Sequence, residues 1–161
     1  VIVSVGYRNE MFEEMNESPE QVKKSLKQRD FNGKVVHCSQ FQARNYLQQV
    51  GFRGIANNQK MQRLFRFALA AYEDGIFIGC SMVFLDIESP VVAFAVISTD
   101  NVATGAELLR KSEDICKIMG FSILKTTNKG FSKEFIRIVD VNRELNDRYS
   151  EGQGYYDRIL H

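Results

Sequence analysis

The stretch RFALAAYEDGIFIGCSMVFLDIESPVVAFAVIS, residues 66–98, decides the fold, because it predicts three β-strands in immediate succession. Asp74 and Gly75 separate the first two apolar runs. Such a pair suits a two-residue hairpin turn, since both residues tolerate a positive φ. A second turn is expected at residues 88–90, which read Glu-Ser-Pro. We therefore expect antiparallel strands over residues 67–72, 76–85 and 91–98.

A helix and a further strand are expected after these three strands. Residues 104–120 (TGAELLRKSEDICKIMG) open with Thr104 and Glu107, which have the spacing of a capping box. Residues at helical spacing form one face that would dock against the sheet. That face comprises Leu108, Ser112, Ile115 and Met119. Residues 121–127 (FSILKTT) then predict a returning strand.

The flanking segments complete a single expected domain. Before the three strands we expect a strand at 34–39, a helix that Ser39 and Gln42 begin as a capping box, and a short helix at 58–65. Residues 155–160 predict a closing strand. Residues 131–149 suit a helix by length and a strand by their β-branched residues, and both alternatives stay open. The predicted core spans residues 34–160, and residues 1–31 form a peripheral strand and helix.

The composition is that of an ordinary globular domain. The chain has 161 residues, of which 44% are apolar and 25% charged, with a net charge of +1. The longest apolar run, residues 76–85, is too short to cross a bilayer, so we expect no membrane partner. Cys38, Cys80 and Cys116 lie far apart and lack the spacing of a metal site or a disulfide framework. We therefore expect no bound metal and a reduced, cytoplasmic setting.

Charge is distributed unevenly along the chain. Residues 31–72 contain no aspartate or glutamate but several basic residues. One interpretation is a pair of solvated, glutamine-rich helices. The other is a surface for an anionic partner, either an acidic protein or a nucleic acid. The basic residues that would form this surface are Arg44, Arg53, Lys60, Arg63 and Arg66.

The order of the expected elements resembles the GCN5-related N-acetyltransferase fold over residues 34–160. This resemblance implies an α/β (α+β) fold, with a mixed, largely antiparallel sheet flanked by helices. It also implies an acetyl-CoA site where the fourth strand meets the next helix, whose N-terminus favours the cofactor diphosphate. The resemblance assigns Val96, Ile97 and Ser98 to pantetheine, Val102, Ala103, Thr104 and Gly105 to the diphosphate, and Asn128 to the turn after the fifth strand.

Residues 100–105 follow the cofactor loop of that family only in part. The family pattern reads Arg/Gln-x-x-Gly-x-Gly/Ala. Gly105 matches its last position, and Ala103 replaces the middle glycine. Asp100 stands where the family has a basic or amide residue, which places a negative charge beside an anionic ligand. A capping role for Thr104 would also occupy an amide that a phosphate needs.

No residue is assigned a catalytic role. Many members of the family carry a tyrosine general acid seven residues after the asparagine, and here that position is Phe135. Glu73, Asp86 and Glu88 flank the strands and could act as a general base or simply be solvated. His37 alternates with apolar residues, so we expect it in the core or on an edge strand. We expect the three cysteines to be small apolar side chains of the core.

A narrower resemblance concerns two short segments. AVISTDNV, residues 95–102, and YSEGQ, residues 149–153, look similar to acetyltransferase-like internal virion proteins of T7-like bacteriophages. That group implies an eroded cofactor loop and a role in particle assembly or DNA delivery. Two functions are therefore expected. The first is transfer of an acyl group from acyl-CoA to an amine, with weak or no activity. The alternative is a non-enzymatic, virion-associated binding or assembly module.

Overall fold

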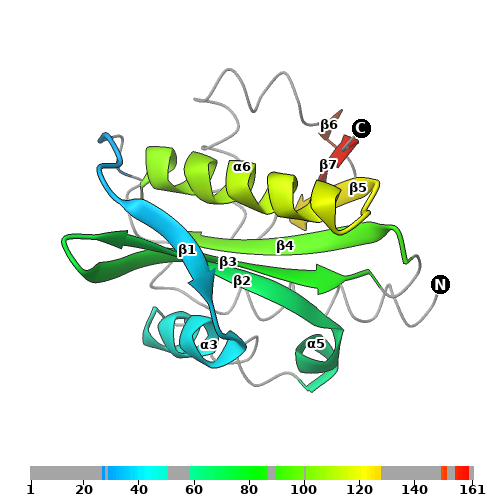
Figure 1. Ribbon diagram of the computed structural model, residues 1–161, viewed down its shortest axis with the longest axis horizontal. Coiled ribbons are helices and arrows are strands. Elements are labelled where there is room, and N and C mark those ends of the chain that lie inside the picture. The colour runs from blue at the N-terminus through cyan, green and yellow to red at the C-terminus, as the bar shows by residue number, and fades with distance from the viewer. Residues whose placement is uncertain are drawn as a thin grey trace.

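The computed structural model describes residues 27, 29–50, 59–86, 90–99, 101–127, 150–151 and 155–159. Its strands form one seven-stranded sheet in the order β1-β2-β3-β4-β5-β7-β6 (Figure 1). The strands are β1 (Lys34–Cys38), β2 (Phe65–Glu73), β3 (Ile76–Leu85), β4 (Val92–Thr99), β5 (Ile123–Thr127), β6 (Ser150–Glu151) and β7 (Tyr155–Ile159). The helices are α3 (Gln40–Gln49), α5 (Gln59–Leu64) and α6 (Val102–Ile118).

The prediction of three consecutive strands is confirmed. β2, β3 and β4 are antiparallel neighbours. Asp74 and Gly75 have φ values of 50° and 76°, the left-handed conformations that this turn requires. The second turn, at residues 88–90, lies partly outside the described residues. β5 runs parallel to β4 while the other neighbours are antiparallel, so the predicted mixed, largely antiparallel α/β (α+β) fold is confirmed.

Helices cover both faces of the sheet. α6 lies along one face, and α3 and α5 lie against the other (Figure 1). Side chains alternate between the faces along a strand. Ser81 of β3 bonds to Ser112 of α6 and so marks the α6 face, while its neighbour Cys80 marks the α3 face. The largest fully buried side chains are Phe84, Phe94, Leu47, Leu69, Met82 and Ile97.

The helix predicted after Ser39 is confirmed with its cap. The Gln42 amide donates to Ser39 Oγ at 3.1 Å, and the Ser39 amide donates to Gln42 Oε1 at 3.0 Å. The Tyr46 hydroxyl donates to the Ile78 carbonyl of β3 at 3.2 Å and ties α3 to the sheet. The short helix predicted at 58–65 is α5, and Phe65 already begins β2.

The predicted beginning of the longest helix is wrong. α6 begins at Val102 with Asn101 as its N-cap, so Thr104 lies inside the first turn. Glu107 accepts from Arg110 at 3.0 Å and does not close a capping box. Thr104 is fully buried, and its hydroxyl accepts from Asn101 Nδ2 at 2.9 Å. The strand therefore runs directly into the helix, and tertiary packing overrides the local preference of Thr104 for a cap.

The face of α6 that meets the sheet is shorter than predicted. Leu108, Ser112 and Cys116 are buried, but Met119 is the C-cap residue and is 46% exposed. Within the described ranges, no helix is both long and apolar enough to cross a membrane. The strand and helix predicted within residues 1–31 lie mostly outside those ranges, and the predictions for residues 131–149 and for Asn128 lie wholly outside them.

Candidate functional site

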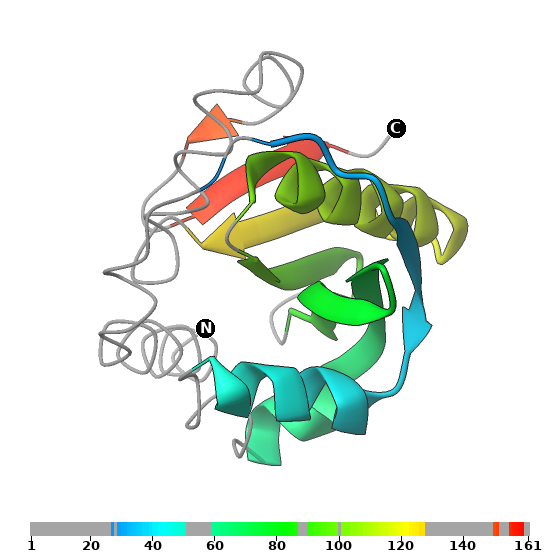
Figure 2. The same cartoon turned by 90° about the vertical axis from the view of Figure 1, so that its left-hand side faces the viewer.

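β4 and β5 separate along their length. Their parallel register runs from Val92↔Ile123 to Ala95↔Thr126. β4 then continues to Thr99, which still pairs with Gly79 of β3 on its other side. Among the described strands, none pairs with residues 96–99 on the β5 side. Figure 2 views the sheet from the end at which the two strands separate. The backbone of residues 96–99 can therefore bind an extended ligand as a neighbouring strand would.

Ser98 lies in this unpaired part of β4. It is fully buried, and its Oγ has no hydrogen-bond partner among the described residues. Its register partner is Cys80, so its side chain lies on the face opposite α6. A buried hydroxyl without a partner costs about 1–3 kcal/mol. A ligand that brings a polar atom to this position would remove that penalty, so Ser98 is a candidate ligand-binding side chain.

The start of α6 lies immediately after this part of β4. Val102, Ala103, Thr104 and Gly105 form its first turn, so the two predicted groups of cofactor residues meet at one end of the sheet. The Gly105 amide donates to the Asn101 carbonyl at 3.0 Å, the first bond of the helix. The Asn101 side chain makes no hydrogen bond to a helix amide. The other amides of the first turn are therefore not occupied by a side-chain cap.

A segment before β1 crosses the N-terminus of α6. The Val102 amide donates to the Lys27 carbonyl at 2.9 Å. The Arg29 amide donates to Asn101 Oδ1 at 3.1 Å. Figure 2 shows this segment in blue above the first turn of α6. We call Lys27 and residues 29–32 the N-terminal strap.

Sequence reasoning missed the strap. The only local indication was that asparagine is a favoured N-cap residue, which pointed to Asn101 but not to its contact with a residue 72 positions earlier.

The other end of the strap is tied to Glu73 at the end of β2. The Arg29 guanidinium forms an ion pair with Glu73 at 2.7 Å, and the Asn32 amide donates to the same carboxylate at 2.8 Å. The Asn32 hydrogen bond, and then Arg29, lower the pKa of Glu73. Glu73 was an open candidate for a general base. Its carboxylate instead anchors the strap.

The other candidate catalytic groups are placed as follows. Asp86 is 3% exposed, and Glu88 lies outside the described residues. His37 is exposed, with its ring edge-on to Phe67 at a centroid distance of 6.3 Å. Neither Asp86 nor His37 adjoins the unpaired edge of β4 in the strand register.

The thiols are unsuited to nucleophilic catalysis. All three cysteines are free. Burial raises the pKa of Cys38 to about 11. Burial, with a smaller contribution from the Glu113 charge, raises the pKa of Cys116 to about 12. Burial also raises the pKa of Cys80. Because the thiolate is the nucleophile, the buried Cys80 and Cys116 and the half-buried Cys38 act as small apolar groups.

Neither a metal cluster nor a described cavity coincides with the unpaired edge of β4. The described residues contain no group of three or more His, Cys, Asp or Glu side chains placed to hold a metal ion. A cavity of about 360 Å³ lies between β1 and α6 and includes Lys34, Glu107 and Lys111. Another of about 610 Å³ lies beside β1 and includes Tyr72 and Asp74. Residues 96–99 line neither of them.

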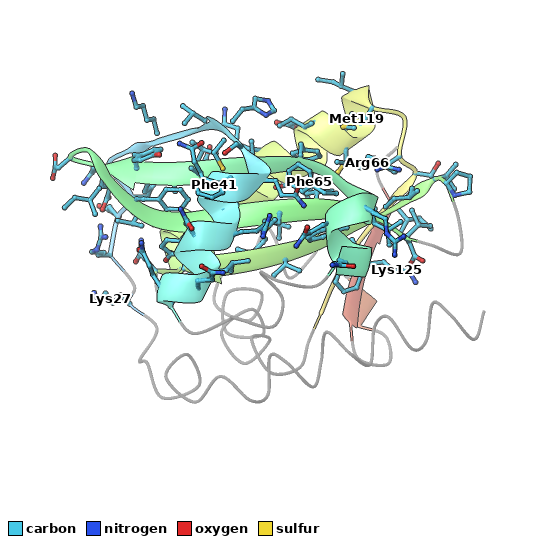
Figure 3. The ribbon with its side chains drawn as sticks, turned by 90° about the horizontal axis from the view of Figure 1, so that it is seen from below. Lys27, Phe41, Phe65, Arg66, Met119 and Lys125 are labelled. Atoms are coloured by element: carbon cyan, nitrogen blue, oxygen red, sulfur yellow. The ribbon has the colours of Figure 1, made fainter. Side chains whose placement is uncertain are left out.

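The predicted basic surface is described only in part. Arg63 and Arg66 are exposed, and Arg66 donates to the Phe65 carbonyl at 3.0 Å. Arg44 is half-buried and has other contacts. Arg53 and the side chain of Lys60 lie outside the described residues. Figure 3 views the face covered by α3 and α5, with Arg66 labelled near the start of β2.

Comparison with known proteins identifies the fold. No protein-family model matches the chain, and no curated protein matches it in sequence. Solved structures do match. An N-acetyltransferase from Staphylococcus aureus Mu50 superposes with a TM-score of 0.57 and 14% identity, over 81% of this chain and 99% of that one. An acetyltransferase of the GNAT family from Streptococcus pneumoniae superposes with a TM-score of 0.57 and 12% identity, over 81% of this chain and 100% of that one.

A third similar structure contains a ligand. A protein from Salmonella typhimurium, solved with its cofactor acetyl-CoA, superposes with a TM-score of 0.59 and 11% identity, over 81% of this chain and 95% of that one. The chain therefore has the fold of the GCN5-related N-acetyltransferases. At these identities the likeness concerns the fold, and activity has to be argued from the site.

Proposed function

We propose that the protein binds acyl-CoA between β4 and β5 and transfers the acyl group to an amine. The observation that carries this proposal is the separation of the two strands after Ala95 and Thr126. Within the described residues, it leaves the edge of β4 without a partner strand, beside the buried Ser98 hydroxyl, which has no hydrogen-bond partner there. The fold supports it, because similar structures include acetyltransferases and one complex with acetyl-CoA.

The residues of this end of the sheet fit the two halves of the ligand unequally. The backbone of Val96, Ile97 and Ser98 would hydrogen-bond the pantetheine arm along its length. The first turn of α6 would hold the diphosphate, because a helix N-terminus attracts anions. Two of its amides are already used, since Val102 donates to Lys27 and Gly105 to Asn101. The fit is therefore good for pantetheine and partial for the diphosphate.

The chain would promote transfer mainly by positioning. When bound, acyl-CoA supplies the acyl group as a thioester, which an amine can attack with release of the thiol. Catalysis by proximity alone can contribute several kcal/mol, on the order of 7–11 in well-oriented cases. The proposal assigns no general acid or base, because Glu73 anchors the strap and position 135 is a phenylalanine.

Calorimetric titration with acetyl-CoA tests this proposal. We expect saturable binding at micromolar concentrations, weakened about tenfold in Ser98→Ala because one hydrogen bond to the ligand is lost. The melting temperature of free Ser98→Ala should be unchanged or higher, because the hydroxyl has no partner to lose. Ser122→Ala, which removes a half-buried hydroxyl at the opposite end of β5, is the matched control and should bind normally. Absence of binding at millimolar acetyl-CoA would overturn the proposal.

A second candidate function is binding of an anionic partner at the basic segment, without catalysis. The exposed Arg63 and Arg66 favour it, since neither forms an ion pair with a carboxylate within the described residues. In a virion-associated module this surface would contact a nucleic acid or an acidic protein.

Charge reversal tests this second candidate. We expect the double variant Arg63→Glu, Arg66→Glu to lose at least about tenfold in affinity for single-stranded DNA or polyglutamate, because like charges repel the anion. Its melting temperature should stay close to that of the wild type. The double variant Lys111→Glu, Lys117→Glu, at two exposed positions of α6, changes the net charge by the same amount, so it is the control and should retain binding. Equal losses in both proteins would assign binding to net charge and contradict a specific surface.

A further inference from the structure

The N-terminal strap occupies an anion-binding position of the fold. The Lys27 carbonyl accepts from the Val102 amide at 2.9 Å. This amide belongs to the first turn of α6, where the diphosphate would bind. A peptide carbonyl and a phosphate oxygen are both acceptors, and they compete for the same N–H group. The Asn101 side chain, which could have capped α6, instead holds the Arg29 amide and so keeps the strap in place.

We propose that the strap closes the diphosphate part of the acyl-CoA site, so that the cofactor binds fully only when the strap is displaced. This inference rests on the proposed function. It predicts that the pantetheine arm meets an open edge of β4, while the nucleotide half must compete with the strap.

The strap is attached by polar contacts on the protein surface. Arg29, Asp30 and Asn32 are exposed, and the Arg29 side chain is 46% exposed. Its ties are the ion pair of Arg29 with Glu73, the Asn32–Glu73 hydrogen bond and the two bonds at α6. Exposed ion pairs contribute about 0.2–1 kcal/mol, which makes release possible. The tightly packed elements below the strap do not have to move for this release.

Closure of the strap lowers the apparent affinity for acetyl-CoA, because only the open molecules can bind its diphosphate. If only the open form accepts the diphosphate, the apparent dissociation constant equals the intrinsic one divided by the fraction of open molecules. Loosening the strap should therefore tighten acetyl-CoA binding. Loss of Glu73 also unmasks the positive charge of Arg29, which attracts an anion. Hydrogen exchange at Arg29 separates closure from this attraction, because only closure requires the Arg29–Asn101 hydrogen bond to break when the cofactor binds.

The test compares Glu73→Ala with Asp114→Ala in the full-length protein. Both changes remove one negative charge, but only Glu73 contacts the strap, and Asp114 is exposed on α6. Calorimetry is performed with acetyl-CoA and with S-acetylpantetheine, which has no diphosphate. We expect Glu73→Ala to bind acetyl-CoA about tenfold more tightly than Asp114→Ala does, and both to bind S-acetylpantetheine equally. Melting curves verify that each variant is folded.

Amide hydrogen exchange on the wild type gives a second, independent readout. On saturation with acetyl-CoA, exchange at Arg29 should accelerate, because its bond to Asn101 breaks, while Val102 stays protected by the ligand. This readout remains decisive if Glu73→Ala does not fold.

Three results would overturn the inference. The first is equal or weaker acetyl-CoA binding in Glu73→Ala relative to its control. The second is bound acetyl-CoA with unchanged exchange at Arg29. The third is absence of binding of both ligands to every variant, which would refute the proposed function itself and with it this role of the strap. Tight binding of S-acetylpantetheine but weak binding of acetyl-CoA in the wild type, with tight acetyl-CoA binding in Glu73→Ala, would be the strongest support.

Discussion

Single polar residues decide how the chain is arranged at the candidate site. Asn101 is fully buried, and both ends of its side-chain amide are hydrogen-bonded, since Oδ1 accepts from Arg29 and Nδ2 donates to Thr104. Glu73 likewise holds two groups, Arg29 and Asn32, at the other end of the strap. Buried or half-buried polar groups are costly unless they are bonded, so such residues specify one geometry. Among the described residues Ser98 is the exception, and for that reason we propose it as a ligand-binding residue.

Gly33 allows the strap to enter β1. A Cβ at this position would overlap the Tyr72 carbonyl oxygen and lie 2.8 Å from Glu73 Cγ. Gly75, in the β2–β3 turn, has open space around it but a φ of 76°. These two glycines are therefore needed for different physical reasons, one steric and one conformational.

Alanine substitutions distinguish the two reasons. Gly33→Ala should destabilise the protein by about 2–3 kcal/mol, because a backbone atom must move to admit the methyl group. Gly75→Ala should cost about 1 kcal/mol, the penalty of a left-handed alanine. Urea unfolding followed by circular dichroism measures both values. A smaller loss for Gly33→Ala than for Gly75→Ala would contradict the close packing at Tyr72.

Between elements, α6 is joined to the sheet by a buried pair of serines. Ser81 Oγ of β3 and Ser112 Oγ of α6 are 2.8 Å apart, and Ser112 Oγ also donates to the Leu108 carbonyl at 2.8 Å. Since the Ser112 proton is used within the helix, Ser81 donates to Ser112. Ser81 therefore needs Ser112 as its acceptor, whereas Ser112 keeps its bond to the Leu108 carbonyl without Ser81.

The serine pair predicts unequal costs of substitution. Ser112→Ala leaves the buried Ser81 hydroxyl without a described partner and should cost about 1–3 kcal/mol, reduced by about 0.5 kcal/mol through the better helix propensity of alanine. Ser81→Ala leaves Ser112 bonded to Leu108 and should cost about 1 kcal/mol or less. The double variant should resemble Ser81→Ala. Chemical unfolding of all three variants completes the cycle, and a larger cost for Ser81→Ala would reverse the assigned donor.

Across the fold, the candidate site lies where segments from distant parts of the chain meet. β4, α6 and the strap meet at one end of the sheet, at which β5 has already separated from β4 (Figure 2). The sheet is continuous through β4, but its parallel contact with β5 covers only the first half of β4. Helices on both faces bury the central strands, so the open edge of β4 belongs to a well-packed sheet. Because this sheet is already in place, a ligand can bind along the edge without reorganisation of the core.

Much of the fold could be predicted from local patterns. The Asp74–Gly75 turn and the Ser39 cap follow from the conformations and hydrogen bonds that these residues favour, and both are observed. The apolar runs of β2, β3 and β4 likewise predict buried strands. The placement of Val96, Ile97 and Ser98 beside the first turn of α6 was expected from the order of elements and is also observed. Their role in cofactor binding stays a prediction.

What local patterns could not decide were contacts between distant residues. Thr104 has the sequence of a cap, yet burial against Asn101 places it inside the helix. Val102 donates to the backbone carbonyl of Lys27, a group that every residue has, so the sequence could not indicate this hydrogen bond. The sequence therefore determined the elements and their order, because turns and caps depend on near neighbours. Only the tertiary structure determined that the strap crosses the N-terminus of α6, because that position depends on packing between segments more than 70 residues apart.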